Sequence, residues 1–325
     1  MTNKLKAGIV GGAGYTGGET LRLLLNHAKV EVAFVQSRSQ AGKPVTAVHT
    51  DLIGETNLNF SSDFLQPVDV LFLCLSHGES QKLLDENNFP DSTRIIDLGN
   101  DFRLNSKFKD REFIYGLPEL HRDAIKVAKN IANPGCFATT IQLGLLPLAK
   151  AGLLTEVHTT GITGSTGAGQ KLQETTHFTW RANNVSAYKT LTHQHLAEIN
   201  ATLKKLQPGF SEEINFVPWR GDFTRGIFVT SVVNCSLSIE ELRTFYGNYY
   251  ASHPFTHMAG EMIDIKQVVN TNKCLIYLEK VGGKLAIHSV TDNLLKGASG
   301  QAVQNMNLMF GFDEAEGLKL KGSVF

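Results

Sequence analysis

The first third of the chain alternates short apolar runs with a segment in which apolar residues recur at helical spacing. The runs at residues 5–11, 30–37, 68–76 and 93–99 predict strands, and segment 17–28 has apolar residues at helical spacing, which predicts a helix. Strands that alternate with helices in this way are typical of a doubly wound, Rossmann-type parallel sheet.

The pattern changes after residue 136. A helix is predicted over 137–152, closed by Gly152, and another over 238–253, with Ser238 as its N-cap. Longer strands joined by turns are predicted at 155–169, 212–219, 224–238, 261–269 and 272–292, and a helix at 293–311. We therefore expect an α/β protein with a second α+β domain, whose sheet is mixed and largely antiparallel. The expected boundaries are 1–134 with 302–325 for the first domain and 135–301 for the catalytic and oligomerisation domain.

Length, charge and cysteine content narrow the class. The chain has 325 residues, enough for two domains, and its 31 basic and 31 acidic side chains cancel, which gives no electrostatic reason to expect nucleic acid or an anionic membrane as a partner. The longest apolar run is far shorter than the ~18 residues of a membrane span. The four cysteines have no metal-type spacing, and Cys74, Cys235 and Cys274 are expected to be buried in strands. We expect a reduced, cytoplasmic enzyme without a targeting segment.

A glycine-rich turn joins the first predicted strand to the first predicted helix. Residues 12–17 are Gly12, Ala13, Gly14, Tyr15, Thr16 and Gly17, in GxGxxG spacing. Between a strand and a helix this spacing predicts a dinucleotide site, because glycine admits the pyrophosphate close to the backbone at a helix N-terminus. The alternative is a tight turn without a ligand.

The end of the second strand favours NADP over NAD. No acidic residue lies between Val32 and Thr50 to bind the ribose hydroxyls, whereas Ser37 and Arg38 could bind a 2′-phosphate. The alternative for Arg38 is a solvated loop charge. Ser76 and His77 follow a later strand and are expected beside the cofactor, since carboxyl ends of parallel strands border such sites.

Cys136 follows Asn133-Pro134-Gly135 directly and precedes a predicted helix. A thiol at a helix start gains thiolate character, with a pKa of roughly 3.5–7.5 in place of ~8.5. With a nicotinamide cofactor, the simplest chemistry is attack of this thiolate on a carbonyl, with hydride transfer to the adduct. The alternative is a small buried hydrophobic side chain.

Three further groups of residues are candidates for the site. His195 and Glu198 share a helix face three residues apart, and with His193 they suggest an acid/base centre, a metal site or ordinary surface residues. The small-residue segment 160–171, which includes Ser165 and Gly167, could wrap a phosphate or form a flexible loop. Arg103 and Arg225 could bind anions, or each could pair with the aspartate two or three residues before it.

Motifs along nearly the whole chain resemble the family of N-acetyl-gamma-glutamyl-phosphate reductases of arginine biosynthesis. The resemblance is carried by GGAGYTGGE, DLGNDFRL, YGLPEL, ANPGCFATT, STGAGQK, HQHLAEI, FTRGI and DNLLKGASGQAVQNMN, in the family's order and spacing. It implies a fold like aspartate-semialdehyde dehydrogenase and an NADPH-dependent reductive dephosphorylation, without a metal. It also implies a homo-dimer or homo-tetramer.

The resemblance implies roles for individual residues. Cys136 matches the nucleophile, His195 the base, and His193 a neighbouring contact. Asn293 and Gly167 fall near the nicotinamide, and the substrate is expected to meet Arg103, Asn133, Ser165, Glu198 and Arg225. The family usually reads Pro-His-Leu where this chain has Pro218-Trp219-Arg220.

This departure raises the question of which N-acyl group the substrate carries. We hypothesise that Trp219 and Arg220 reshape the acyl pocket, and that Arg220 pairs with an extra carboxylate of the kind an N-succinyl substrate carries; the alternative is an arginine that points to solvent. Three other functions are left open: reduction of another acyl phosphate, as in aspartate-semialdehyde dehydrogenase; a Cys/His hydrolase without a cofactor, which the glycine loop disfavours; and a non-catalytic NADP-binding regulator.

Overall fold

The computed structural model describes residues 4–323, which form two compact units. Unit 1 contains the chain up to Pro134 together with Ala298–Lys319, and unit 2 contains Gly135–Gly297 and the residues from Leu320 onward. The sequence placed the last boundary after residue 301, whereas the contacts group residues 298–301 with unit 1.

Unit 1 is built on an eight-stranded sheet in the order β3-β2-β1-β4-β5-β8-β7-β6. Its strands are β1 (Leu5–Val10), β2 (Val30–Gln36), β3 (Phe60–Ser61), β4 (Val70–Leu73), β5 (Arg94–Asp97), β6 (Lys107–Phe108), β7 (Arg111–Tyr115) and β8 (Asn130–Ala132). All neighbours are parallel except the β6–β7 hairpin. The predicted doubly wound parallel sheet is confirmed.

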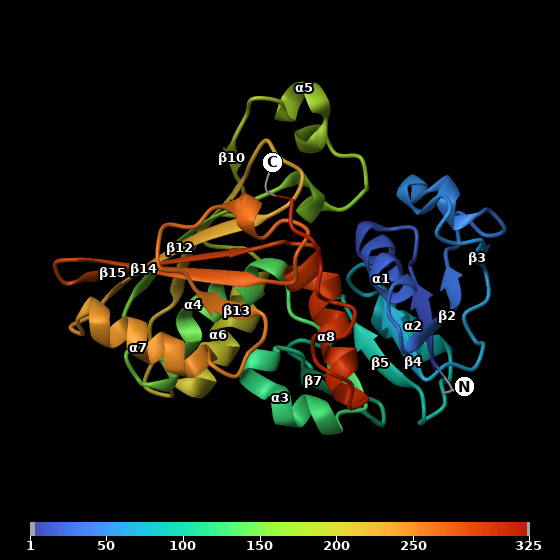
Figure 1. Ribbon diagram of the computed structural model, residues 1–325, viewed down its shortest axis with the longest axis horizontal. Coiled ribbons are helices and arrows are strands. Elements are labelled where there is room, and N and C mark those ends of the chain that lie inside the picture. The colour runs from blue at the N-terminus through green and yellow to red at the C-terminus, as the bar shows by residue number, and fades with distance from the viewer. Residues whose placement is uncertain (1–3, 324–325) are drawn as a thin grey trace. The chain divides into compact units, whose positions relative to one another are not determined.

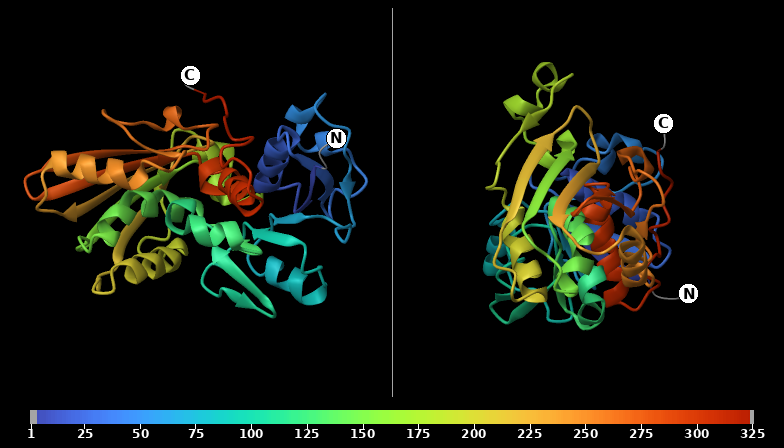
Figure 2. Two further views of the ribbon diagram at one scale, coloured as in Figure 1. Left: turned by 60° about the horizontal axis from the view of Figure 1, so that its bottom comes forward. Right: turned by 90° about the vertical axis from the view of Figure 1, so that its left-hand side faces the viewer.

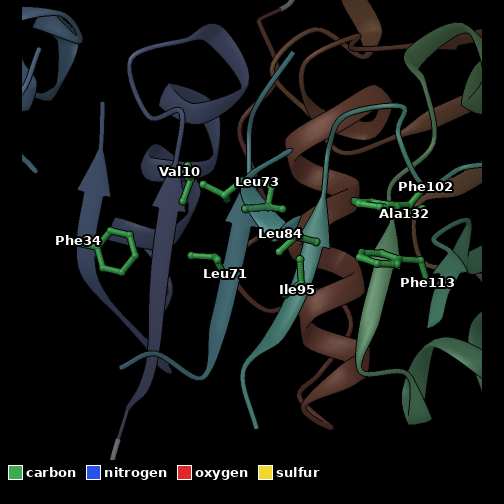
Figure 3. Close-up of a cluster of buried hydrophobic side chains, with 10 residues drawn as sticks. Val10, Phe34, Leu71, Leu73, Leu84, Ile95, Phe102, Phe113 and Ala132 are labelled. Atoms are coloured by element: carbon green, nitrogen blue, oxygen red, sulfur yellow. The ribbon is translucent and has the colours of Figure 1, made fainter. Parts of the chain in front are cut away.

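Helices cover both faces of this sheet. They are α1 (Tyr15–Leu25), α2 (Glu79–Glu86), α3 (Pro118–Val127) and α8 (Gly300–Met309). Side chains of α2 join the apolar cluster on one face, which includes Val10, Phe34, Leu71 and Ile95 (Figure 3). Helix α8 is buried along its whole length and packs beside α1 and α3, on the face behind that cluster (Figure 3).

Unit 2 is built on a seven-stranded mixed sheet in the order β10-β11-β9-β12-β15-β14-β13. Its strands are β9 (Val157–Thr163), β10 (Ser186–Ala187), β11 (Ile214–Arg220), β12 (Ile227–Asn234), β13 (Thr256–Met258), β14 (Cys274–Val281) and β15 (Lys284–Thr291). Only the β9–β11 and β13–β14 pairs are parallel, so the predicted, largely antiparallel sheet is confirmed.

The strand predicted over 261–269 is wrong. This segment is a loop with one short turn, Ile265–Gln267, and its apolar Ile263 and Val268 pack on the sheet beside Phe228 and Tyr277. Its hydrophobicity therefore serves to cover a sheet face rather than to pair as a strand. Of the three cysteines predicted to be buried, Cys274 is buried, whereas Cys74 and Cys235 are partly exposed.

The helices of unit 2 are α4 (Cys136–Lys150), α5 (Phe178–Arg181), α6 (His195–Leu206) and α7 (Ile239–Tyr250). Helices α4 and α6 pack together, and α4 lies against β12 and β15 (Figure 2). The predicted Ser238 cap of α7 is a full capping box with Glu241. Residues 164–192, which we call the arm, carry α5 and project beyond the β10 edge of the sheet (Figures 1 and 2).

Candidate active site

The glycine turn of unit 1 fits a dinucleotide pyrophosphate. A Cβ on Gly12 would lie 2.1 Å from Cγ1 of Val35, and one on Gly17 would lie 2.5 Å from the carbonyl oxygen of Gly11, so both positions require glycine. Helix α1 begins here with Gly14 as N-cap and no side-chain cap. The first backbone N–H groups of α1, from Tyr15 to Gly17, are thus available to an anionic ligand.

The end of β2 fits a 2′-phosphate better than free ribose hydroxyls. Ser37 is buried, whereas the Arg38 side chain is 70% exposed and only 4.0 Å from Glu79. No carboxylate lies on the segment between Val32 and Thr50. A solvent-facing guanidinium at this place can meet an added phosphate without first losing a buried partner.

His77 belongs to a small polar cluster at the start of α2. Its Nδ1 lies 2.5 Å from Oδ1 of Asn100 and 3.0 Å from Oδ1 of Asp101, and its side chain is 78% exposed. Asp101 also accepts the backbone N–H groups of Gly78 and Gln81, which caps the helix. Ser76 accepts a turn hydrogen bond from Glu79, so the loop after β4 is ordered.

Arg103 and Asn133 shape the turn that leads to Cys136. Arg103 donates to the carbonyls of Asn133 and Leu98, at 2.8 and 3.1 Å. The Asn133 amide donates to the carbonyl of Ala298 and its oxygen accepts from Asn305. The guanidinium thus holds the carbonyls of Asn133 and Leu98 in place.

Cys136 is the first residue of α4, with Gly135 as an extended N-cap and no side-chain cap. Two glycines let other groups approach it closely. A Cβ on Gly135 would lie 2.3 Å from Nε2 of His195, and one on Gly297 would lie 2.9 Å from Cβ of Cys136. The thiol therefore sits at a helix start, next to a residue whose missing side chain makes room for an imidazole.

His193, His195 and Glu198 come together as the spacing predicts. The rings of His193 and His195 are 4.7 Å apart, and Oε1 of Glu198 lies 4.0 Å from Nε2 of His195. The other oxygen of Glu198 accepts the backbone N–H of Gly135 at 3.2 Å. Glu198 thus ties the start of α6 to the residue before Cys136, and its other oxygen lies at the limit of ion-pair distance from the His195 imidazole.

Burial separates the two histidines chemically. Burial, followed by the charges of His195 and Lys189, lowers the pKa of His193 to about 3. His193 is therefore neutral at physiological pH and does not exchange protons there. No group of three or more His, Cys, Asp or Glu side chains arranged to hold a metal ion occurs among residues 4–323.

The small-residue segment is a short turn, Ser165–Ala168, held by its neighbours. Ser165 donates its N–H to the carbonyl of Phe223 at 2.8 Å. A Cβ on Gly167 would meet only Thr163, at 3.4 Å, so this turn remains open on that side. Asn293 links the turn to the sheet, because its amide donates to Thr166 Oγ1 and its oxygen accepts from the N–H of Gly226.

Arg225 forms an ion pair, but not with the aspartate three residues before it. Its guanidinium binds Asp292 with both arms, at 3.0 and 3.1 Å. Asp222 instead accepts the N–H of Asn183. Asp292 is fully buried and was not singled out in the sequence, because a charged partner 67 positions away leaves no local signal.

Trp219 and Arg220 lie on opposite faces of β11. The side chains of Ile214, Phe216 and Pro218 are buried, and Arg220 has the same parity as these residues. Phe216 contacts Phe137 of α4 and His193, with ring centroids 5.0 and 5.5 Å apart. Strand alternation therefore places Arg220 on the face of the sheet that carries Cys136 and the histidines, and Trp219 on the other face.

Tyr188 and Arg181 are two site residues that the sequence did not reveal. The Tyr188 ring lies 5.7 Å from that of His193 and under the Arg220 guanidinium, at 4.8 Å. Burial, and next the charge of Cys136, raises the pKa of Tyr188, whereas the charge and hydrogen bond of Arg220 oppose this rise. Both residues lie in the arm, which has no periodic pattern; only a tyrosine five residues before His193 could have drawn attention.

Comparison with known proteins identifies the class. A family model described as semialdehyde dehydrogenase, NAD binding domain, matches residues 6–128, and one described as semialdehyde dehydrogenase, dimerisation domain, matches residues 136–293. The chain belongs to the semialdehyde dehydrogenase family and is an oxidoreductase with an NAD-binding and a dimerisation domain. This confirms the predicted dinucleotide-binding domain and the predicted class of enzyme.

Curated relatives narrow the family further. The chain is 57% identical to the N-acetyl-gamma-glutamyl-phosphate reductase of Phocaeicola vulgatus and 54% identical to that of Christiangramia forsetii, over 99% of this chain and 100% of each relative. Within the semialdehyde dehydrogenases, it therefore belongs to the family of N-acetyl-gamma-glutamyl-phosphate reductases. The resemblance seen in the sequence motifs is confirmed.

Solved structures support the fold. Aspartate semialdehyde dehydrogenase II from Vibrio cholerae, complexed with ASA, aligns with a TM-score of 0.73 at 16% identity, over 95% of this chain and 99% of that one. The enzyme from Candida albicans with NADP aligns with a TM-score of 0.68 at 13% identity, over 94% of this chain and 98% of that one. Separately, none of the helices within residues 4–323 has the length and hydropathy needed to cross a membrane.

Proposed function

We propose that this chain reduces an N-acyl-L-glutamyl 5-phosphate to the N-acylglutamate 5-semialdehyde, with NADPH as reductant and release of phosphate, as a step of arginine biosynthesis. The observation that carries the proposal is the start of α4. Cys136 lies at a helix N-terminus, with His195 packed on the preceding glycine and Glu198 bound to that glycine's N–H. This arrangement suits a thiolate nucleophile with an adjacent acid/base group.

NADPH is the cofactor that the nucleotide loop accommodates best. Gly12, Gly14 and Gly17 would receive the pyrophosphate at the start of α1, and Ser37 and Arg38 would receive the 2′-phosphate. Ser76, His77, Gly167 and Asn293 stay proposed as further cofactor neighbours. When bound, the nicotinamide supplies the hydride.

Cys136 and His195 divide the remaining chemistry. The Cys136 thiolate attacks the acyl carbon, the bond from that carbon to the phosphate oxygen breaks, and a thioester forms as phosphate leaves. Once the thioester carbonyl has been reduced, His195 donates a proton to the resulting oxygen. It then accepts that proton back as the C–S bond breaks, which releases the aldehyde and restores the thiolate.

Other residues position these two. Glu198 and Gly135 hold the imidazole, and neutral His193 packs against it without a charge to compete for the thiolate. Arg103 and Asn133 set the turn before Cys136, and the turn that contains Ser165 is bonded to the segment that leads to Arg225. We propose these last four as contacts of the acyl phosphate.

We infer that the chain forms a homo-oligomer through the sheet of unit 2. The face of this sheet opposite α4 is only partly covered, and Thr230, Val232 and Tyr277 on it are half-buried. A partly apolar sheet face of this kind is suited to pack against the same face of a second copy of the chain.

The reaction run in reverse tests the function. The protein is mixed with NADP⁺, phosphate and an N-acylglutamate semialdehyde, and NADPH is followed at its absorbance maximum, with Cys136→Ser in parallel. We expect NADPH from the wild type and none from the variant. If protein that binds NADP⁺ forms no NADPH with N-acetyl- or N-succinyl-glutamate semialdehyde, the reductase proposal is wrong and a non-catalytic nucleotide-binding role takes its place.

A further inference from the structure

Arg220 places a charged side chain in a partly shielded position, and such a position calls for a structural or functional explanation. It ends β11, between β10 and β9, and its parity puts it on the face shared by Phe216 and the histidines. The side chain does not point freely into solvent: its residue is only partly exposed and its Nε is shielded. The solvated-arginine alternative therefore does not describe this residue.

The Arg220 guanidinium lacks an anionic partner. Among the described residues its Nε has no hydrogen-bond partner, and no acidic side chain lies within ion-pair distance of it. Its other polar contacts go to neutral hydroxyls: a long hydrogen bond of 3.4 Å to Thr175 Oγ1 and one to Tyr188. A shielded guanidinium N–H without an acceptor costs free energy unless a ligand supplies one.

A second arginine makes this region more positive. Arg181 is 5% exposed, and its guanidinium donates to the carbonyls of Thr175, Asn184 and Arg220 and to the Ser186 hydroxyl. None of these acceptors is charged. Burial, followed by the charge of Arg220, lowers the pKa of Arg181, whereas the charge of Asp222 opposes this shift.

The contacts of Arg181 also show that the Arg220 side chain is not needed to hold the arm in place. The arm is already fastened to the end of β11 by the bond from Arg181 to the Arg220 carbonyl, at 2.7 Å. That bond needs only the backbone of residue 220. The side chain of Arg220 is therefore available to bind a ligand.

The segment that carries Tyr188 is held in a strained conformation. Among the described residues, five that are not glycine have positive φ, and three of them, Asn183, Lys189 and Leu191, lie within nine residues of one another around Tyr188. Such left-handed positions are unfavourable for side-chain-bearing residues and concentrate at ligand clamps. Within this segment, the Tyr188 ring contacts both the Arg220 guanidinium and the His193 ring.

We propose that Arg220, stacked on Tyr188, binds a carboxylate at the far end of the substrate's N-acyl group. The substrate class is then an N-acylglutamyl phosphate whose acyl group is a dicarboxylic acid, such as succinyl, in preference to acetyl. This proposal rests on the proposed function, because it names the acyl group that the same site accepts.

The length of such a substrate agrees with the geometry. Eight bonds separate the reacting carbon from the carboxylate carbon of an N-succinyl group, an extended span of roughly 9–10 Å. Tyr188 lies two ring-to-ring steps from His195, of 5.7 and 4.7 Å. An acetyl group ends two bonds earlier and carries no carboxylate, so it leaves the guanidinium without an acceptor.

Matched aldehydes test the proposal. Kinetics are measured in the reverse direction with N-succinyl-, N-acetyl- and N-butyryl-glutamate semialdehyde, the last having nearly the length of succinyl without its charge. The proteins are wild type, Arg220→Gln, Arg220→Lys and Arg243→Gln, which removes an exposed arginine of α7 in the same unit. Thermal unfolding of each variant checks that it is folded.

We expect the wild type to prefer N-succinyl over both neutral aldehydes by roughly 10- to 100-fold in kcat/KM, the range of a charge-assisted hydrogen bond. Arg220→Gln should lose this preference through KM, Arg220→Lys should keep part of it, and Arg243→Gln should match the wild type. Binding of N-succinylglutamate, which lacks a reactive aldehyde, should weaken in parallel in calorimetry.

The outcomes separate the two proposals. Turnover of N-acetyl-glutamate semialdehyde as good as that of N-succinyl, with equal losses for both in Arg220→Gln, would overturn the carboxylate subsite and leave the reductase function intact. Absence of turnover with every aldehyde would overturn the reductase function itself. A preference for N-butyryl equal to that for N-succinyl would show that length, not charge, is recognised, and would also overturn the subsite.

Discussion

At the scale of single residues, the site depends on atoms that are absent as much as on those present. Gly135 and Gly297 have no side chains, and each lets a neighbouring group lie closer than a Cβ would allow. GxGxxG and Pro-Gly-Cys were recognisable in the sequence because local turns require them. The need for glycine at 297 was not, since Cys136, which fills that space, is 161 positions away.

Adding one methyl group at Gly135 is a direct test. Gly135→Ala places a Cβ 2.3 Å from Nε2 of His195, so the imidazole must move away. We expect kcat/KM to fall by about 100-fold, because displacement of a catalytic group by about 1 Å has effects of this size.

The control is Gly247→Ala in α7, where a Cβ meets nothing within 4 Å. This variant should keep full activity and gain about 0.5–1 kcal/mol of unfolding free energy in a urea titration. Full activity in Gly135→Ala would contradict the assignment of His195.

His193 leads to a prediction about pH. Its pKa is about 3 in the folded chain and about 6.5 when unfolded, so the unfolded state binds the extra proton between these values. The stability that His193 contributes is complete above pH 6.5 and decreases as the pH falls towards 3. For one proton, the loss between pH 7 and pH 5 is about 2 kcal/mol.

Urea unfolding at both pH values checks this. The decrease from pH 7 to pH 5 should be smaller in His193→Asn than in the wild type by up to about 2 kcal/mol. Equal decreases in the two proteins would mean that His193 is protonated in the folded state.

At the scale of elements, the sequence predicted what is periodic and missed what is not. The longer strands, β1, β2, β4, β5, β9, β11, β12, β14 and β15, and helices α1, α4 and α7 were expected because burial imposes a period of two or 3.6 on their side chains. The short strands β3, β6, β7, β8, β10 and β13 were not expected. The loop at 261–269 has apolar residues without pairing, and was taken for a strand. The arm has no period at all, so its α5, Arg181 and Tyr188 could not be placed.

Asp292 connects three elements and should be essential for stability. It binds Arg225 and accepts the N–H groups of Asn270, Leu294 and Leu295 while fully buried. Asp292→Asn leaves Arg225 without its charged partner, and we expect a loss of about 2–4 kcal/mol in unfolding free energy.

The comparison is Glu240→Gln, at an exposed position in the first turn of α7. It should change the unfolding free energy by less than about 0.5 kcal/mol. An unfolding free energy of Asp292→Asn within that same margin of the wild type would show that the ion pair is dispensable.

At the scale of the whole molecule, the class of enzyme was predictable and the assembly was less so. Motifs spread over both units specified the family, because each one marks a turn or a helix start with a fixed chemistry. The proposed interface leaves only a weak signal in the sequence: in β12 and β14, apolar side chains occur on the half-buried face as well as on the buried face.

A charge on that half-buried face should separate the copies. Val232→Asp lies in β12, paired with His158 and Ala286, and would place a carboxylate inside the proposed interface. Light scattering after gel filtration should show a dimer or tetramer for the wild type and a smaller species for the variant.

Val281→Asp is the matched control, the same change on the same sheet at a position 79% exposed. It should assemble like the wild type. If Val232→Asp remains folded and also keeps the wild-type mass, the interface lies elsewhere.

The division of the chain into units has a consequence for biosynthesis. Unit 2 is inserted between β8 and α8 of unit 1, and α8 supplies buried contacts such as that of Asn307 with His27. During translation, unit 1 therefore cannot complete its fold until α8 has been made, which happens only after residues 135–297 of unit 2 have been translated. At 5–20 residues per second, this delay is roughly ten to thirty-five seconds, during which the apolar surface meant for α8 is open to chaperones.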